Sequence, residues 1–189
     1  MGSHWLALVS EVMLQRTKVS SVLPVWITFT ERYPDLKSAA CSPIEEFRSV
    51  LYPLGLRWRI DLLRDLIEVL HQNDGVPLTK IGLMKLPGVG EYVASAFLSF
   101  HAGERAVIVD ANVVRWICRM TGEKYDGETR RQQWLIDLAN LLTPSRVHRD
   151  YNYGVLDLAI SVCKRKPDCR VCPVSEHCLY WKNVSGSRV

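Results

Sequence analysis

The sequence contains no apolar run long enough to cross a bilayer, because charged residues interrupt every hydrophobic stretch well before about 18 residues. It has no basic N-terminal segment leading into an apolar run and a cleavage site, so nothing points to secretion. Internal repeats and low-complexity tracts are missing as well. With 48% hydrophobic and 23% charged residues among 189, the chain is neither disordered nor collagen-like. We therefore expect one or two globular domains in the cytoplasm, with no membrane partner.

Positive charge is in slight excess and is unevenly distributed along the chain. The chain has 24 Lys plus Arg against 20 Asp plus Glu, a formal net charge of +4. Residues 1–104 carry 10 basic and 11 acidic groups, whereas residues 105–189 carry 14 and 9. A basic half attracts polyanions, and nucleic acid is favoured here because no basic amphipathic helix indicates a membrane surface. Composition therefore permits DNA or RNA binding without proving it.

Cysteine is scarce outside one short segment. Cys41 and Cys118 are isolated in predicted helices, which is typical of buried, inert thiols. The other four fall within sixteen residues, as Cys163, Cys169, Cys172 and Cys178. Without a secretory signal, such a group indicates a metal site rather than disulfides. Four thiolates suit either tetrahedral zinc or a 4Fe–4S cluster, so ligand type alone leaves both open.

Apolar residues recur at helical spacing through almost the whole chain, which predicts an all-α fold. The segment Ser42–Glu45 has the form of a capping box with proline at the first helical position, and it predicts a helix that ends near Pro53. Residues 106–109 are rich in β-branched side chains but stand alone, so we expect an extended connector. The other predicted helices cover residues 5–15, 19–33, 57–73, 79–86, 91–100, 111–120, 128–142 and 152–162.

Residues 87–90 join two of these helices and carry glycine at positions 88 and 90. Glycine lets the backbone turn tightly and expose consecutive N–H groups at a helix start, where a phosphate binds without a basic side chain. An ordinary turn between two helices uses the same spacing. The segment alone does not decide between the two interpretations.

Several segments, in order along the chain, resemble the helix-hairpin-helix (HhH-GPD) superfamily of DNA glycosylases, which includes endonuclease III and adenine glycosylases. They are Ser10–Thr17, Leu86–Gly90, Val109–Asn112 and His148–Gly154, followed by the four cysteines. Together they are most similar to the mismatch-specific branch that acts on T or U opposite G. The resemblance implies a two-lobed all-α fold, with a helical barrel domain (1–104) containing the hairpin 86–90. The second domain (105–189) would hold an iron–sulfur cluster in the loop 163–178.

The same resemblance implies excision of a damaged or mispaired base from a bent duplex, after the target nucleotide is flipped out. Gly88, Val89 and Gly90 would hold the DNA backbone. Asp110 would face the sugar, where a fixed carboxylate stabilises an oxocarbenium-like transition state or activates water. From the residues alone, the simpler interpretation of Asp110 is an N-cap for the helix that begins near Ala111.

Tyr92 indicates the subtype within this resemblance. In bifunctional relatives similar to endonuclease III, a lysine at this position forms a Schiff base that leads to strand cleavage. A phenol cannot do so, which predicts a monofunctional glycosylase without lyase activity. Adenine glycosylases usually carry serine here and thymine glycosylases tyrosine, so Tyr92 favours the thymine branch; the alternative role is aromatic packing. Only eleven residues follow Cys178, so we also expect the extra C-terminal domain of adenine glycosylases to be absent.

Both branches carry the acid found here as Glu11, whose helical neighbours are apolar. We expect Glu11 to be partly buried and to share a proton with the leaving base, the alternative being an acid in a wet groove or paired with arginine. Arg16 lies where this branch places a wedge against the orphaned guanine, whose O6 and N7 suit arginine, and we expect Gln15 beside it to contact DNA as well. The segment Leu54–Arg57 resembles the second intercalating loop, with Leu56 and Arg57 as the expected DNA contacts. For these residues a solvated helix face or a core leucine is the alternative.

The resemblance selects the 4Fe–4S cluster over zinc, in a mainly structural role that presents basic residues to DNA. Two features depart from the family pattern. The first cysteine spacing has five intervening residues where six are usual, which leaves zinc open. Glu91 follows the hairpin where a basic residue is common, and an acid there should weaken phosphate binding unless it points away.

The sequence therefore predicts a monomeric, nucleoid-associated glycosylase that excises thymine or uracil mispaired with guanine in double-stranded DNA. A second enzyme interpretation is removal of adenine opposite G or 8-oxoguanine, with Glu11 as the proton donor. A third, from another class, is a non-catalytic module that binds distorted DNA. A zinc protein with no nucleic-acid role is the remaining alternative.

Overall fold

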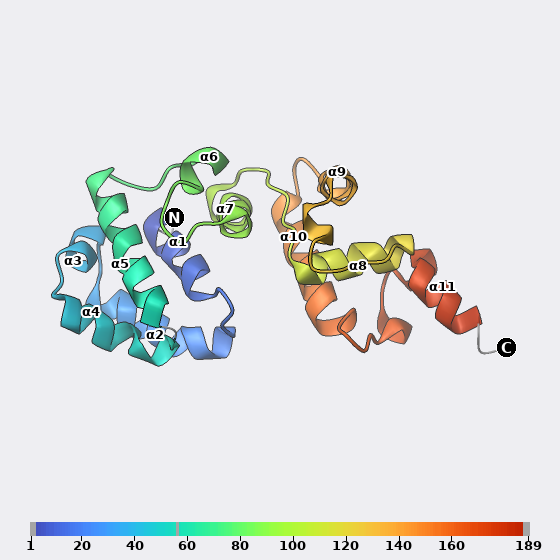
Figure 1. The fold of residues 1–189 in the computed structure, drawn as a ribbon, viewed down its shortest axis with the longest axis horizontal. Helices are drawn as coiled ribbons and strands as arrows, with labels where there is room; N and C mark the ends of the chain where they lie inside the picture. The colour runs from blue at the N-terminus through green and yellow to red at the C-terminus, as the bar shows by residue number, and fades with distance from the viewer. Residues whose placement is uncertain (1–2, 56, 187–189) are drawn as a thin grey trace. The chain divides into compact units, whose positions relative to one another are not determined.

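The computed structural model describes residues 3–55 and 57–186, and within them the secondary structure is helical, with no strand (Figure 1). The prediction of an all-α chain is confirmed. The chain divides into two compact units, the first ending at Ala102 and the second beginning at Gly103. No helix in the described residues is long and apolar enough to span a membrane.

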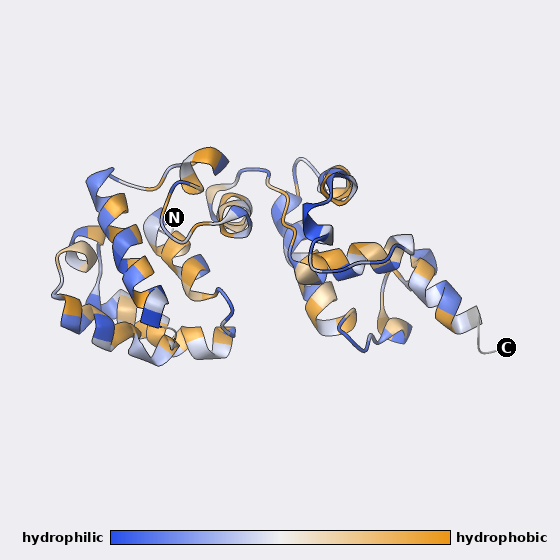
Figure 2. Cartoon of the chain, in the orientation of Figure 1, coloured by the Kyte–Doolittle hydropathy of each residue, from blue (hydrophilic) through white to orange (hydrophobic). Residues whose placement is uncertain are grey.

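The first unit is built around its first helix. α1 packs against α2, α5 and α7, and four of its side chains, Leu8, Val9, Val12 and Met13, are fully buried (Figure 1). This burial follows from a sequence that is apolar on most faces of the helix, as Figure 2 shows. The helices are α1 (His4–Met13), α2 (Val19–Arg32), α3 (Leu36–Ala40), α4 (Ile44–Leu51), α5 (Arg57–Gln72), α6 (Lys80–Leu83) and α7 (Glu91–Phe97), with a 3-10 turn (Tyr52–Leu54) and a π-helical turn, η2 (Leu98–Ala102).

The second unit is arranged around α8, which contacts α9, α10 and α11. One face of α8 supplies Val113, Val114 and Ile117 to a core that also contains Leu135 and Ala139. The helices are α8 (Ala111–Thr121), α9 (Gln133–Leu142), α10 (His148–Asp157) and α11 (Leu179–Gly186), with a π-helical turn (Leu158–Val162) and 3-10 turns at Thr129–Arg131, Cys169–Val171 and Ser175–His177. Residues 103–110 have no regular secondary structure, which agrees with the connector predicted for 106–109.

The predicted capping box at Ser42 is wrong. The N-cap of α4 is Pro43, which has no side-chain cap bond. Ser42 instead donates its hydroxyl to the carbonyl of Ala39 (2.9 Å) and accepts a bond from Arg64 Nη1 (3.1 Å). The hydroxyl closes the preceding helix rather than opening the next one, because serine bonds a nearby carbonyl as readily as an amide.

The capping box in this region lies one helix earlier. Asp35 accepts a bond from the amide of Ser38 (2.7 Å), and the Ser38 side chain accepts one from the Asp35 amide (3.3 Å). The predicted helix over residues 128–142 is also divided, since a 3-10 turn ending at Arg131 precedes α9.

Candidate active site

The two hairpin glycines have different structural roles. Gly88 has φ +74°, and a Cβ there would lie 2.5 Å from Leu62 Cδ2. Gly90 is the N-cap of α7 with φ −86°, and a Cβ there would meet nothing within 4 Å. The expectation that both glycines are needed for the turn therefore holds only for Gly88, which fits a left-handed conformation and a close contact. Gly90 leaves open space beside the first amides of α7, which have no acceptors within the helix.

Glu91, the acid expected to disfavour phosphate, pairs with Lys80 of the preceding helix. Lys80 Nζ lies 2.7 Å from Glu91 Oε1, and both side chains are exposed. An exposed pair adds little stability. Its effect here is to place a compensating positive charge beside the hairpin.

The turn after α1, residues 14–17, is joined to the hairpin. Gln15 Nε2 donates to the carbonyl oxygen of Gly88 at 2.8 Å. Arg16 follows with φ +55°, a conformation that costs a non-glycine residue about 1–2 kcal/mol. The structure thus brings two predicted DNA-binding segments together, and Arg16 in the first of them is exposed.

Arg59, which the sequence analysis missed, holds this turn from inside the unit. Its side chain is fully buried, and Nη1 donates to the carbonyl of Met13 (2.6 Å) and to Thr17 Oγ1 (2.7 Å). Burial lowers the pKa of Arg59. In the described part of the chain its Nε and Nη2 atoms have no hydrogen-bond partner. Arg59 lies in the first turn of α5, two residues after the exposed Arg57; Leu56 lies outside the described residues.

Glu11 is mostly buried on α1 and forms a hydrogen-bonded pair with a histidine. Its side chain is 11% exposed, and His101 Nε2 lies 2.9 Å from Glu11 Oε1. The prediction of partial burial is confirmed, but the partner is histidine rather than arginine. Tyr92, in the first turn of α7 in the same unit, is 38% exposed.

Asp110 in the second unit caps α8 with both carboxylate oxygens engaged. Oδ1 accepts bonds from the amides of Asn112 (2.8 Å) and Val113 (2.7 Å), and Oδ2 accepts one from Asn112 Nδ2 (2.7 Å). The N-cap interpretation is therefore right. It is also compatible with a catalytic role, because the cap fixes the carboxylate at the start of a helix.

The bonds at Asp110 continue into the cysteine segment. Arg115, one turn along α8, donates to Asn112 Oδ1 (3.0 Å) and to the carbonyl oxygen of Cys163 (2.8 Å). A third bond reaches the carbonyl of Ala159 (2.6 Å). Arg115 was missed in the sequence; the available signal was its position three residues after Asn112, on the same helix face.

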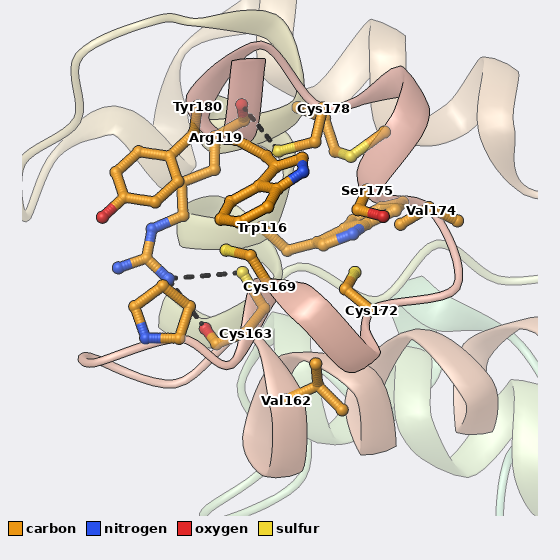
Figure 3. Close-up of a pocket in the computed structure, with 13 residues that line it drawn as sticks. Trp116, Arg119, Val162, Cys163, Cys169, Cys172, Val174, Ser175, Cys178 and Tyr180 are labelled. Carbon is orange, nitrogen blue, oxygen red and sulfur yellow. Dashed lines mark hydrogen bonds between the residues drawn. The ribbon is translucent and has the colours of Figure 1, made fainter. Parts of the chain in front are cut away.

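All four predicted metal ligands line one pocket in the second unit (Figure 3). Arg119 crosses this pocket: Nη1 lies 3.3 Å from Cys163 Sγ, and the guanidinium lies 4.9 Å from the centre of the Tyr180 ring. Burial, and then the nearness of the other three cysteines, raises the pKa of the Cys169 thiol. Four thiolates here would repel one another, so the pocket requires a cation before all four ionise.

The chemistry of the donor set suits a 4Fe–4S cluster, in which each of four thiolates binds its own iron, and it suits zinc as well. Among the described residues, however, no three His, Cys, Asp or Glu side chains converge closely enough to hold a metal ion, so the four cysteines line the pocket without forming a closed ligand set. Trp116 lines the same pocket with a buried Nε1 that has no partner in the described residues, a donor that a cluster sulfur would satisfy.

The sequence and the fold are both similar to those of known DNA glycosylases. Residues 9–140 match the HhH-GPD superfamily of base excision DNA repair proteins. The chain is 34% identical to a thymine/uracil-DNA glycosylase of Pyrobaculum aerophilum, over 96% of this chain and 82% of the relative. It is also 34% identical to an adenine DNA glycosylase of Mycolicibacterium smegmatis, over 96% of this chain and 62% of the relative. The solved structure of a thermostable thymine-DNA glycosylase superimposes with a TM-score of 0.89 at 30% identity, covering 97% of this chain and 86% of that one.

Alanine substitutions at the two hairpin glycines should separate folding from DNA binding. Gly88→Ala should lower the free energy of unfolding by about 1–3 kcal/mol, because of its positive φ and the contact with Leu62. Gly90→Ala should change the free energy of unfolding by less than about 0.5 kcal/mol but weaken duplex binding, because the new methyl group occupies the open space. Chemical denaturation and fluorescence anisotropy measure the two quantities. Unchanged duplex affinity in Gly90→Ala would show that DNA does not approach at Gly90.

Proposed function

The chain belongs to the HhH-GPD superfamily of base excision DNA repair proteins, and from this membership we propose that it excises thymine or uracil mispaired with guanine. We propose that it acts as a monomer on double-stranded DNA by hydrolysing the N-glycosidic bond. The observation that carries the substrate assignment is the likeness to the P. aerophilum thymine/uracil-DNA glycosylase over 96% of this chain and 82% of that relative.

Asp110 is the residue we assign to the sugar. Departure of the base breaks its bond to C1′ and leaves positive charge on the sugar ring, and water then adds to C1′. A carboxylate stabilises that charge most when it is already in place and need not reorganise during the reaction. The three hydrogen bonds to Asp110 from Asn112 and Val113 support this role.

Glu11 and Tyr92 are the residues we assign to the base. The pyrimidine leaves as an anion unless it is protonated or hydrogen-bonded, and a mostly buried carboxyl group suits proton sharing. Tyr92 carries no amine, so the reaction ends at an abasic site without a Schiff base.

The hairpin and the turn after α1 are the segments we assign to the duplex. The amides at Gly90 and the start of α7 would bind a phosphate, and Gly88 and Val89 shape the hairpin that presents them. Arg16 would enter the space left by the flipped base and donate to guanine. The support is its exposed position in a turn that Gln15 and Arg59 hold from both sides.

Cys163, Cys169, Cys172 and Cys178 would hold a 4Fe–4S cluster. The cluster would supply structural cross-linking of the loop rather than a chemical step. Four basic residues of this loop would then be fixed in position to contact phosphates; they are Lys164, Arg165, Lys166 and Arg170, and all are exposed.

Adenine excision is the second candidate, because Glu11 suits protonation of a purine as well. The adenine glycosylase of M. smegmatis and the thymine/uracil relative are each 34% identical to this chain, so identity does not separate the two candidates. Tyr92 favours the thymine branch.

The substrate assignment is tested with four labelled duplexes that contain T·G, U·G, A·G or A opposite 8-oxoguanine. We expect cleavage of the T and U strands only after hot alkali, since an abasic site is stable until base is added. Cleavage of the A strand would move the assignment to the adenine branch, and nicking without alkali would contradict the role of Tyr92. Binding of mismatched duplex with no alkali-labile site in any lane would favour the non-catalytic module.

Asp110→Asn should abolish excision while preserving fold and duplex binding. Asparagine is as good an N-cap as aspartate, so α8 keeps its start, but the charge that stabilises the sugar cation is lost. We expect at least a ~1,000-fold lower single-turnover rate, comparable to losing the main electrostatic group of an active site. Asp65→Asn, an exposed position on α5, is the matched control. Full activity of Asp110→Asn would overturn the proposed mechanism.

Metal analysis tests the cluster separately. The purified protein should contain about four iron and four sulfide per chain, and Cys172→Ser should lower both. Cys41→Ser should leave both unchanged, because Cys41 is an exposed thiol of the first unit. The prediction that this thiol is buried is wrong, whereas Cys118 is buried as predicted. One zinc per chain and no iron would select the zinc alternative.

A further inference from the structure

We propose that His101 is a positioning residue for Glu11, fixing which carboxylate oxygen meets the leaving base. The inference rests on the proposed function, since it assumes that Glu11 engages the base. Neither the motif Ser10–Thr17 nor the hairpin predicts this pair, which joins residues 90 positions apart in the sequence.

A break in regular helix geometry determines where His101 lies. α7 is α-helical to Phe97 and continues as the π-helical turn η2, which ends at Ala102. A π-turn inserts an extra residue, so the side chains that follow rotate around the helix axis relative to a continuous α-helix. Both α7 and η2 pack against α1, the helix that carries Glu11. Single π-turns of this kind occur frequently at functional sites.

Two aromatic rings restrict the imidazole. The ring of His101 lies 6.1 Å from that of Phe97 in a tilted arrangement and 6.3 Å from that of Phe100 at 87°. Both phenylalanines are buried, so they form a fixed wall. The imidazole therefore has little rotational freedom with which to leave Glu11.

The hydrogen bond assigns roles to the two oxygens of Glu11. His101 Nε2 lies 2.9 Å from Oε1, and in the tautomer with hydrogen on Nε2 it donates to that oxygen. We therefore assign Oε2 to the base. The side chains of His101 and Glu11 are only 28% and 11% exposed, so water competes weakly for this bond. A carboxyl group held in this way rarely occupies unproductive rotamers, so it is already oriented when the base arrives.

The test compares His101→Ala with His101→Gln in single-turnover excision from a U·G duplex. Alanine removes the donor, so we expect a rate lower by about 10- to 100-fold with duplex affinity within about twofold of wild type. Glutamine places an amide nitrogen near the position of Nε2 and should restore the rate to within about threefold. His71→Ala, an exposed histidine at the end of α5, is the control and should match wild type.

A double-mutant cycle shows whether His101 acts through Glu11. In the Glu11→Gln background, His101→Ala should lower the rate by less than about twofold, because the group that it positions has already lost its acid. An equal loss in both backgrounds, an unaffected His101→Ala variant, or a glutamine variant as slow as the alanine variant would each overturn the proposal.

A measurement without turnover separates this proposal from the proposed function. The side-chain carboxyl resonance of Glu11, identified by its absence in Glu11→Gln, should shift in His101→Ala and stay near its wild-type position in His101→Gln. If wild type excises no base, the proposed function fails while this resonance still reports on the pair. An unshifted resonance in His101→Ala would overturn the pairing itself.

Discussion

The hydrogen-bonded cap at Asp110 links the chemistry that we propose for the second unit to the folding of that unit. The carboxylate opens α8, and the same helix delivers Val113, Val114 and Ile117 to the core. Any packing force that fixes α8 therefore also fixes the carboxylate, without extra elements dedicated to it. The bonds from Asn112 to Arg115 and on to the Cys163 carbonyl extend this constraint to the cysteine loop. A cluster that orders the loop would thus stabilise the position of Asp110 without taking part in the reaction.

In the first unit, the turn that we assign to DNA contact has a strained backbone. Arg16 adopts a left-handed conformation directly after α1. Arg59 offsets that cost by capping the carbonyl of Met13, the last residue of α1, with a cation that also interacts favourably with the helix dipole. Burying a guanidinium is expensive when two of its nitrogens have no hydrogen-bond partner among the residues that the structure describes, and apolar packing would stabilise the unit better. We interpret the arginine as a device that favours one conformation of the turn.

Sequence patterns predicted the local features and missed the long-range ones. Helical periodicity, the glycine-containing turn of the hairpin and the cap at Asp110 are encoded within a few neighbouring residues. The bonds made by Arg59 to Met13 and by His101 to Glu11 join residues 46 and 90 positions apart, which no short window contains. The π-turn at 98–102 has no signature in residue type. The error at Ser42 has the same origin. Its hydroxyl bonds to the carbonyl of Ala39 and to Arg64, and Arg64 lies 22 positions away in the sequence.

The distribution of charge explains how a hairpin followed by an acid suits a DNA-binding protein. The first unit has ten basic and ten acidic residues, so the whole net charge of +4 belongs to the second unit, with 14 and 10. Long-range attraction to a polyanion therefore comes from the second unit, through counterion release. In the proposed function the hairpin then needs only backbone amides, which would bind one phosphate by geometry rather than by charge. Under that proposal Glu91 would be tolerated, because Lys80 neutralises it locally and the hairpin would position the duplex rather than attract it.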